Sequence, residues 1–318
     1  MADACNLAIP YLYDVDRRKW VKNFSRESVL YISTELEKEE VQTCFLAYVS
    51  GVPEAHILDN MYEEGEEERV DRAIELLEES DLFVEYISDF DIDDIQNLIE
   101  LYIINHDIGY AFFDYIHLAP KLMASTTKAM GTKLREDQIL YLFGVVLKAM
   151  ANKYNIFLQS STQLNRGYKE DGNLDASALR GAMSLGDKLD IGIISLPVTI
   201  KELEKLEPII KKLQDNTFGN RNNCVPTMSH TIYKNRGNKK NAIRIWTRME
   251  LDNIREKTIF VTNMDYKIID EQLDKVAFCP PNSDLDNEIL DYLNGHTNVR
   301  PEKLYVPKIS KEKLQDVT

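Results

Sequence analysis

Uninterrupted apolar runs alternate with amphipathic segments over the first two thirds of the chain. The runs are residues 28–33, 82–87, 110–114, 155–160 and 191–196. Continuous rather than alternating hydrophobicity is typical of strands buried on both faces. Segments with apolar positions at helical spacing lie among the runs, at residues 35–51, 69–79, 92–103 and 138–154. The strand–helix order predicts an α/β fold with a mostly parallel sheet and flanking helices.

The pattern changes after the last of these runs. Residues 199–215 predict a charged helix, and strands near 229–234 and 242–248 flank a polar turn. Such a pair predicts a C-terminal antiparallel hairpin, which we expect to extend the sheet. Beyond the hairpin the pattern weakens and several prolines interrupt it. We therefore predict one domain over residues 1–254 and a partly disordered extension over 255–318.

The composition is that of a water-soluble globular protein, with 44% hydrophobic and 29% charged residues among 318. No apolar run approaches the roughly 18 residues of a membrane helix, so we expect no membrane partner. The first residues carry neither a basic stretch nor an apolar core, so they do not resemble a signal peptide. The four cysteines form no CxxC pair, which favours reduced thiols and a cytoplasmic location.

The net charge of −15, from 38 basic and 53 acidic residues, argues against a protein that coats nucleic acid. The acidic residues are concentrated in two runs, however, at residues 63–68 and 75–81. Basic residues gather elsewhere, including residues 133–135 and 234–248. A ring-shaped protein can be acidic outside and basic only along its channel, so net charge leaves the partner open.

Two carboxylates follow predicted strands. Asp114 ends the run 110–114, and Glu35 stands just after the run 28–33. Ligands bind at the carboxyl ends of open parallel sheets, where an acid can orient Mg²⁺ and a second acid can activate water. The alternatives are an Asp that caps the next segment and a Glu in the first turn of a helix.

A neutral amide and two cations complete the candidate chemistry. Gln163 follows the run 155–160 and could sense a terminal phosphate, although a polar loop residue would look the same. Lys234 and Arg236 are two positions apart at the hairpin tip, so they face the same way on a strand. Such cations can reach the triphosphate of a neighbouring subunit, but a basic turn is the commoner explanation.

The order of these residues resembles the DnaB-type replicative DNA helicases. The passages that carry the resemblance are Tyr-Ile-Ser-Thr-Glu-Leu (31–36), Phe-Phe-Asp-Tyr-Ile-His-Leu (112–118), Phe-Leu-Gln-Ser-Ser-Thr-Gln-Leu-Asn-Arg (157–166), Leu-Arg-Gly-Ala-Met-Ser-Leu-Gly-Asp-Lys-Leu-Asp-Ile-Gly (179–192) and Tyr-Lys-Asn-Arg-Gly (233–237). They span about residues 28–250, and Gln-Leu-Asn-Arg is the most specific element among them. A RecA-like recombinase or a KaiC-like clock ATPase shares the fold, but this element and the hairpin favour the helicase.

The resemblance implies a RecA-like, ATP-dependent DNA helicase motor that works as a homohexamer on single-stranded DNA. Glu35 would be the general base, Asp114 the Mg²⁺ acid and Gln163 the γ-phosphate sensor. Lys234 and Arg236 would act on the adjacent subunit's ATP. A helicase loader or a primase would be a further partner. The cations expected to line the DNA channel are Lys121, Lys128, Lys133, Arg166, Lys169 and Arg180.

One motif of the family is absent. The phosphate-binding loop G-x-x-x-x-G-K-S/T requires a Gly-Lys dipeptide, which occurs nowhere in the 318 residues. Residues 2–10 look like the helix that follows this loop, so we expect the chain to begin just past it and not to hydrolyse ATP alone. The additions at residues 14–28 and 199–215 suggest a phage variant. The alternative is a non-catalytic RecA-fold scaffold that binds a helicase ring or its loader.

Overall fold

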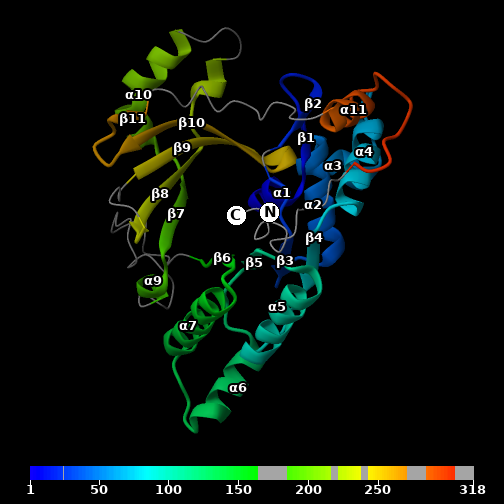
Figure 1. Ribbon diagram of the computed structural model, residues 1–318. Coiled ribbons are helices and arrows are strands. Elements are labelled where there is room, and N and C mark those ends of the chain that lie inside the picture. Colours follow the sequence, from blue (N-terminus) through cyan, green and yellow to red (C-terminus); the bar gives the residue numbers. More distant parts are fainter. Residues whose placement is uncertain (24, 164–184, 216–220, 238–242, 271–283, 305–318) are drawn as a thin grey trace, which may run out of the picture.

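A four-stranded parallel sheet forms the centre of the molecule (Figure 1). The computed structural model describes residues 1–23, 25–163, 185–215, 221–237, 243–270 and 284–304. The strands of the sheet are β3 (Val29–Ser33), β4 (Leu82–Tyr86), β5 (Tyr110–Asp114) and β6 (Phe157–Ser160). Their spatial order is β4-β3-β5-β6, with every pair parallel. The predicted α/β class is confirmed.

Helices cover both faces of this sheet (Figure 1). On one face lie α1 (Ala2–Ala8), α2 (Lys38–Ser50) and α4 (Glu66–Glu78), with the short α3 (Glu54–Asp59) beside α2. On the other lie α5 (Ile92–His106), α6 (Pro120–Met130) and α7 (Glu136–Tyr154). Strand β3 shows the result: Val29 and Tyr31 belong to the first core, and Leu30 and Ile32 to the second. This two-sided burial explains its uninterrupted apolar run.

The start of helix α2 differs from the prediction. We expected the helix from Glu35, but it begins at Lys38, and Glu37 and Glu40 form a reciprocal capping box before its first turn. These hydrogen bonds satisfy amide groups that a helix leaves unpaired, which fixes the start at this point. Glu35 therefore lies in the connection after β3. The interpretation of Glu35 as a first-turn helix acid is wrong.

A second sheet of five antiparallel strands follows along the chain. Its strands are β7 (Ile191–Pro197), β8 (Met228–Asn235), β9 (Ile243–Glu250), β10 (Arg255–Asn263) and β11 (Ile268–Asp270), in the order β11-β10-β9-β8-β7. The short helix α9 (Leu185–Lys188) precedes it, 3₁₀ turns at Arg221–Cys224 and Leu251–Asn253 flank its strands, and α10 (Ile200–Asp215) covers one face. Leu206 and Ile210 of α10 pack with Trp246 and Phe260 there.

The predicted hairpin exists as β8 and β9, but it does not extend the parallel sheet. Strand β7, which we had placed with the parallel strands, instead pairs antiparallel with β8. Exposed and buried residues alternate along β7, because α10 covers one face of the second sheet and no other described helix packs on the opposite face. Ile191 and Ile193 are about half exposed on the other face, at 51% and 54%. An apolar run alone could not distinguish these two situations.

The segments with weak sequence signals also contain regular structure. Strands β1 (Tyr11–Asp14) and β2 (Lys19–Lys22) form a small antiparallel hairpin. Helix α11 (Asp284–Leu293) packs on the first core through Ile289 and Leu293. Strand β10 pairs with β9, so residues on both sides of position 254 share one sheet. The boundary at 254 stays a prediction. Within the described residues, no helix combines the length and apolar character needed to cross a membrane.

Candidate functional site

The carboxyl ends of three neighbouring strands bring the predicted site residues to one edge of the parallel sheet. Strand β5 lies between β3 and β6, and Ser33 pairs with Asp114 in register. Glu35 follows β3 by two residues, Asp114 is the last residue of β5, and Gln163 follows β6 by three. Strand β3, which precedes Glu35, and strand β5, which ends at Asp114, are therefore neighbours. The chemical roles of Glu35 and Asp114 stay predictions.

Both carboxylate oxygens of Asp114 accept hydrogen bonds from hydroxyl groups. The phenol of Tyr31, which is buried in β3, donates to Oδ2, and Ser161 donates to Oδ1 over 2.9 Å. Burial, followed by the charge of Asp114, raises the pKa of Tyr31 far above its ordinary value. Tyr31 therefore stays protonated and remains a donor at any physiological pH. The orientation of the Asp114 carboxylate is determined from two sides.

The segments after the three strands are also connected through their backbones. The amide and the hydroxyl of Thr34 both donate to the carbonyl of Asp114, over 2.9 and 3.1 Å. The amide of Ile116 donates to the carbonyl of Ser161 over 2.9 Å. The connections after β3, β5 and β6 are thus hydrogen-bonded to one another close to the ends of the strands. These bonds restrict movement of the site residues relative to one another.

Glu35 and Gln163 are both exposed to solvent at this edge. The side-chain amide of Gln163 donates over 3.5 Å to the phenol oxygen of Tyr115, the residue directly after Asp114. A carboxylate and an amide that face water beside a fixed carboxylate can contact a ligand without displacing core side chains. The expected roles of Glu35 as a general base and of Gln163 as a phosphate sensor require such access and stay predictions.

Lys234 and Arg236 lie at the end of β8, in the second sheet. The ammonium of Lys234 donates to the carbonyl of Gly186 over 2.6 Å. The backbone amide of Arg236 donates to the carbonyl of Asp190 over 2.8 Å, and its guanidinium lies 3.8 Å from the Asp190 carboxylate. Asp190 also forms an ion pair with Lys148 of α7. The two cations thus belong to a different element from Glu35, Asp114 and Gln163.

The cations predicted to line a DNA channel fall into three groups. Lys128 and Lys133 are exposed, in α6 and between α6 and α7. Lys121 instead forms ion pairs with Asp94, at 2.5 Å, and with Asp91, at 3.8 Å. The remaining predicted cations, Arg166, Lys169 and Arg180, lie outside the described residues.

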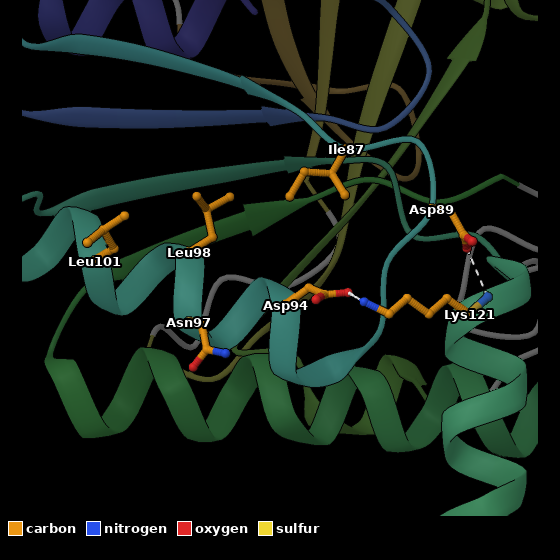
Figure 2. Close-up of a pocket in the computed structure, with 7 residues that line it drawn as sticks. All are labelled: Ile87, Asp89, Asp94, Asn97, Leu98, Leu101 and Lys121. Carbon is orange, nitrogen blue, oxygen red and sulfur yellow. Dashed lines mark hydrogen bonds and ion pairs between the residues drawn. The ribbon is translucent and has the colours of Figure 1, made fainter.

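Lys121 also borders a pocket of about 420 Å³ beside helix α5 (Figure 2). The lining residues are Ile87, Asp89, Asp94, Asn97, Leu98, Leu101 and Lys121. Burial alone would raise the pKa of Asp94, but the hydrogen bond and charge of Lys121 outweigh it and hold that pKa below its ordinary value. Because Lys121 is engaged with acids of its own chain, this pocket is a poorer place for phosphate than the edge around Asp114.

The donor set at the edge suits Mg²⁺ rather than a metal held by protein alone. Among the residues that the structure describes, no group of three or more His, Cys, Asp or Glu could enclose a metal ion. Magnesium at nucleotide sites keeps several waters and uses one or two carboxylates together with phosphate oxygens. Asp114, with Glu35 just after the adjacent strand, provides such carboxylates.

Comparison with known proteins agrees with this geometry. Residues 15–193 match the family described as the DnaB-like helicase C terminal domain, and the chain belongs to that family. The chain is 39% identical over 273 residues to the SPbeta prophage-derived uncharacterized protein YorI of Bacillus subtilis (strain 168). The match covers 85% of this chain and 53% of YorI, so the chain spans about half the length of that relative.

Two solved structures share the fold. One is described as an ATPase domain, with a TM-score of 0.55, 15% identity, and coverage of 72% of this chain and 74% of that one. The other is a DnaB-like replicative helicase studied with its primase, with a TM-score of 0.54, 14% identity, and coverage of 72% and 50%. At these identities the likeness concerns the fold, which is RecA-like as predicted.

Sequence reasoning missed the residues that support Asp114. Tyr31 stands in an apolar run that predicted a buried strand, and no role was predicted for Ser161 or Thr34. One signal was available, because the hydroxyl of a buried tyrosine normally needs a hydrogen-bond partner. The pattern could not tell which partner, since Tyr31 and Asp114 are separated by 83 positions.

Proposed function

We propose that this chain is the ATP-hydrolysing motor part of a DnaB-like replicative helicase ring, of the kind carried by phages. The observation that carries the proposal is the common edge of β3, β5 and β6, where Glu35, Asp114 and Gln163 emerge beside one another. Membership of the DnaB-like family and the prophage origin of YorI support it.

In this proposal each residue at the edge has one task. Asp114, oriented by two hydroxyl donors, would help to hold Mg²⁺. The ion would neutralise charge on the phosphate oxygens. Glu35 is exposed to solvent and accepts the proton of the attacking water, and Gln163 contacts the terminal phosphate. Their solvent exposure supports these assignments.

The phosphate cradle is the component that these residues do not provide. No Gly-Lys dipeptide occurs among the 318 residues, so in this proposal the backbone amides and lysine that hold the β- and γ-phosphates come from another polypeptide segment. YorI is about twice as long as its matched part, so a relative of this chain does contain further sequence. We therefore propose that the 318 residues alone bind ATP poorly and do not hydrolyse it.

The remaining assignments concern assembly. We propose that the chain forms a homohexamer in which Lys234 and Arg236 reach the ATP of the adjacent subunit. Their place in a different sheet from Asp114 is compatible with action between subunits. Lys128 and Lys133, with Arg166, Lys169 and Arg180, would grip single-stranded DNA without reading its sequence. A primase or a loader is a proposed partner.

The test compares two purified proteins, the 318-residue chain and the full reading frame, meaning the longest in-frame polypeptide that contains these residues. We expect the full reading frame to contain G-x-x-x-x-G-K-S/T and to hydrolyse ATP faster when single-stranded DNA is added. Glu35→Gln should lower kcat by about 100-fold or more, because general-base catalysis contributes about that much. The 318-residue chain should show no activity above background.

Two outcomes contradict the proposal. The first is ATP hydrolysis by the 318-residue chain that Glu35→Gln abolishes, since this would mean that the missing loop is not required. The second is a full reading frame without the motif and without ATPase activity, together with binding to a helicase ring. That result would favour the non-catalytic scaffold, which the absent Gly-Lys dipeptide makes the second candidate.

A further inference from the structure

We infer that Tyr31 is a positioning residue for the metal site, which holds the Asp114 carboxylate in the orientation that binds Mg²⁺. The inference rests on the proposed function, because it concerns the same edge of the sheet. Tyr31 is 1% exposed, yet its phenol reaches past the core and donates to Oδ2 of Asp114.

The ring of Tyr31 is fixed before any ligand binds. It packs edge-on against Phe45 of α2, with ring centroids 5.5 Å apart, and is stacked on Phe112 of β5 at 6.3 Å. Because these aromatic contacts hold the ring, the phenol oxygen occupies a defined place under the carboxylate. Aromatic pairs of this geometry favour one arrangement over others. The hydrogen bond to Asp114 is therefore made by a rigid donor.

The second donor completes a clamp on the carboxylate. Ser161 approaches Oδ1 over 2.9 Å from the connection after β6, while Tyr31 approaches Oδ2 from β3. An ionised carboxylate has about four acceptor positions, two on each oxygen. The two hydroxyls use one position on each oxygen and leave the others for water molecules around Mg²⁺. The clamp thus restricts rotation of the carboxylate.

A carboxylate without this clamp would bind the metal less well. Hydrogen bonds behind metal ligands typically change metal affinity about 10- to 100-fold when they are removed. Tyr31→Phe removes one oxygen atom and keeps the ring, so the contacts with Phe45 and Phe112 remain. The same change elsewhere provides a control. Tyr102 of α5 also donates its phenol to a carboxylate, that of Glu85 in β4, a strand that does not pair with β5.

The experiment measures Mn²⁺ binding, as a visible substitute for Mg²⁺, by electron paramagnetic resonance in the presence of ADP. The proteins are the full reading frame defined above and its variants Tyr31→Phe, Tyr102→Phe and Asp114→Asn. We expect Tyr31→Phe to weaken Mn²⁺ binding about tenfold and Tyr102→Phe to leave it within about twofold of wild type. In ATPase assays, Tyr31→Phe should raise the Mg²⁺ concentration for half-maximal rate more than it lowers kcat at saturating Mg²⁺.

The outcomes separate this inference from the proposed function. If Asp114→Asn binds Mn²⁺ as wild type does, Asp114 is not the metal acid and the proposed function fails at that point. If Asp114→Asn loses binding while Tyr31→Phe keeps wild-type affinity, the positioning role alone is overturned. Thermal unfolding checks that Tyr31→Phe is folded. If it is not, Ser161→Ala removes the exposed half of the clamp, and unchanged Mn²⁺ affinity in that variant contradicts the inference.

Discussion

Gly51 ends helix α2 in the left-handed region of backbone conformation, with a φ of 66°, and its amide donates to the carbonyl of Ala47. In the last turn of the helix, the guanidinium of Arg255 donates to the carbonyl of Tyr48 over 3.0 and 2.6 Å. The last carbonyls of a helix lack partners within the helix and carry its negative dipole end. Gly51 therefore ends the helix through its left-handed backbone conformation. Arg255, from a distant strand, provides a positively charged donor for a carbonyl of the last turn.

Replacing Gly51 with alanine should destabilise the protein by about 2 kcal/mol. A side chain disfavours the left-handed conformation, and a Cβ atom here would lie 2.6 Å from Cγ2 of Val15 and 3.3 Å from the Arg255 guanidinium. The measurement is the free energy of unfolding in urea. Gly65→Ala is the matched control, because Gly65 has a φ of 77° but open space around it. Equal losses in the two variants would show that crowding at Gly51 has no effect.

At the scale of elements, helix α10 is attached to the second sheet by a polar contact as well as by its apolar face. The Arg244 side chain, 3% exposed, forms an ion pair with Glu202 and lies 4.3 Å over the Trp246 ring. Burial alone would raise the pKa of Glu202, but the backbone amide of Thr199 and the Arg244 guanidinium outweigh it. The pKa of Glu202 therefore lies below its ordinary value.

This lowered pKa predicts a pH dependence. The unfolded chain takes up the proton of Glu202 at a higher pH than the folded protein does, so the stabilisation is complete above the ordinary pKa of 4.5 and disappears as pH falls below it. Glu202→Gln should cost about 2 kcal/mol at neutral pH, as expected for a hydrogen bond to a charged group. The difference from wild type should shrink at about pH 3.5.

Urea unfolding at both pH values measures this effect. Glu204→Gln is the control, because Glu204 is exposed on the same helix. A Glu202→Gln variant whose loss of stability is the same at both pH values would contradict the assigned role of the ionised carboxylate.

At the scale of the whole molecule, one buried carboxylate joins the two ends of the chain. Asp286 of α11 is 4% exposed and accepts hydrogen bonds from Tyr11, Lys22 and Arg26, at 2.6, 2.9 and 2.7 Å. These donors lie on the β1–β2 hairpin and just after it, at separations of 275, 264 and 260 positions. The contact holds the C-terminal helix on the first core, where Ile289 and Leu293 are buried.

Asp286→Ala should lower the free energy of unfolding by about 3 kcal/mol, because it leaves two cations and a phenol without their shared acceptor. Thermal and urea unfolding measure the loss, and limited proteolysis should cut first near α11. Asp284→Ala on the exposed side of the same helix serves as the control. If the two variants are equally stable, Asp286 does not hold the helix in place.

Elements that depend on interactions between residues close in the sequence were predicted better than elements that depend on contacts between distant residues. Residues 92–103 were predicted as a helix, and α5 begins after Asp91 in a capping box with Asp94. This signal is local, since the residues that form the cap are three positions apart. By contrast, the position of α11 depends on Asp286 and on partners near the other end of the chain.

The candidate site shows the same division. Its residue types and their order after strands were visible in the sequence, and parallel pairing places Glu35, Asp114 and Gln163 at one edge. The clamp of Tyr31 and Ser161 on Asp114 was not visible, because it depends on which hydroxyls three neighbouring strands bring to the same carboxylate. Neither spacing nor composition contains that information.

The sequence by itself determined the parallel α/β core, the DnaB-like character and the edge at which the predicted chemistry gathers. These follow from local periodicity and from the rule that parallel strands end on the same side. Only the tertiary structure decided that β7 to β11 form a sheet of their own, that Glu35 precedes rather than begins α2, and that α11 returns to the β1–β2 hairpin. Each of these depends on competition among distant contacts, and a local pattern cannot rank such contacts.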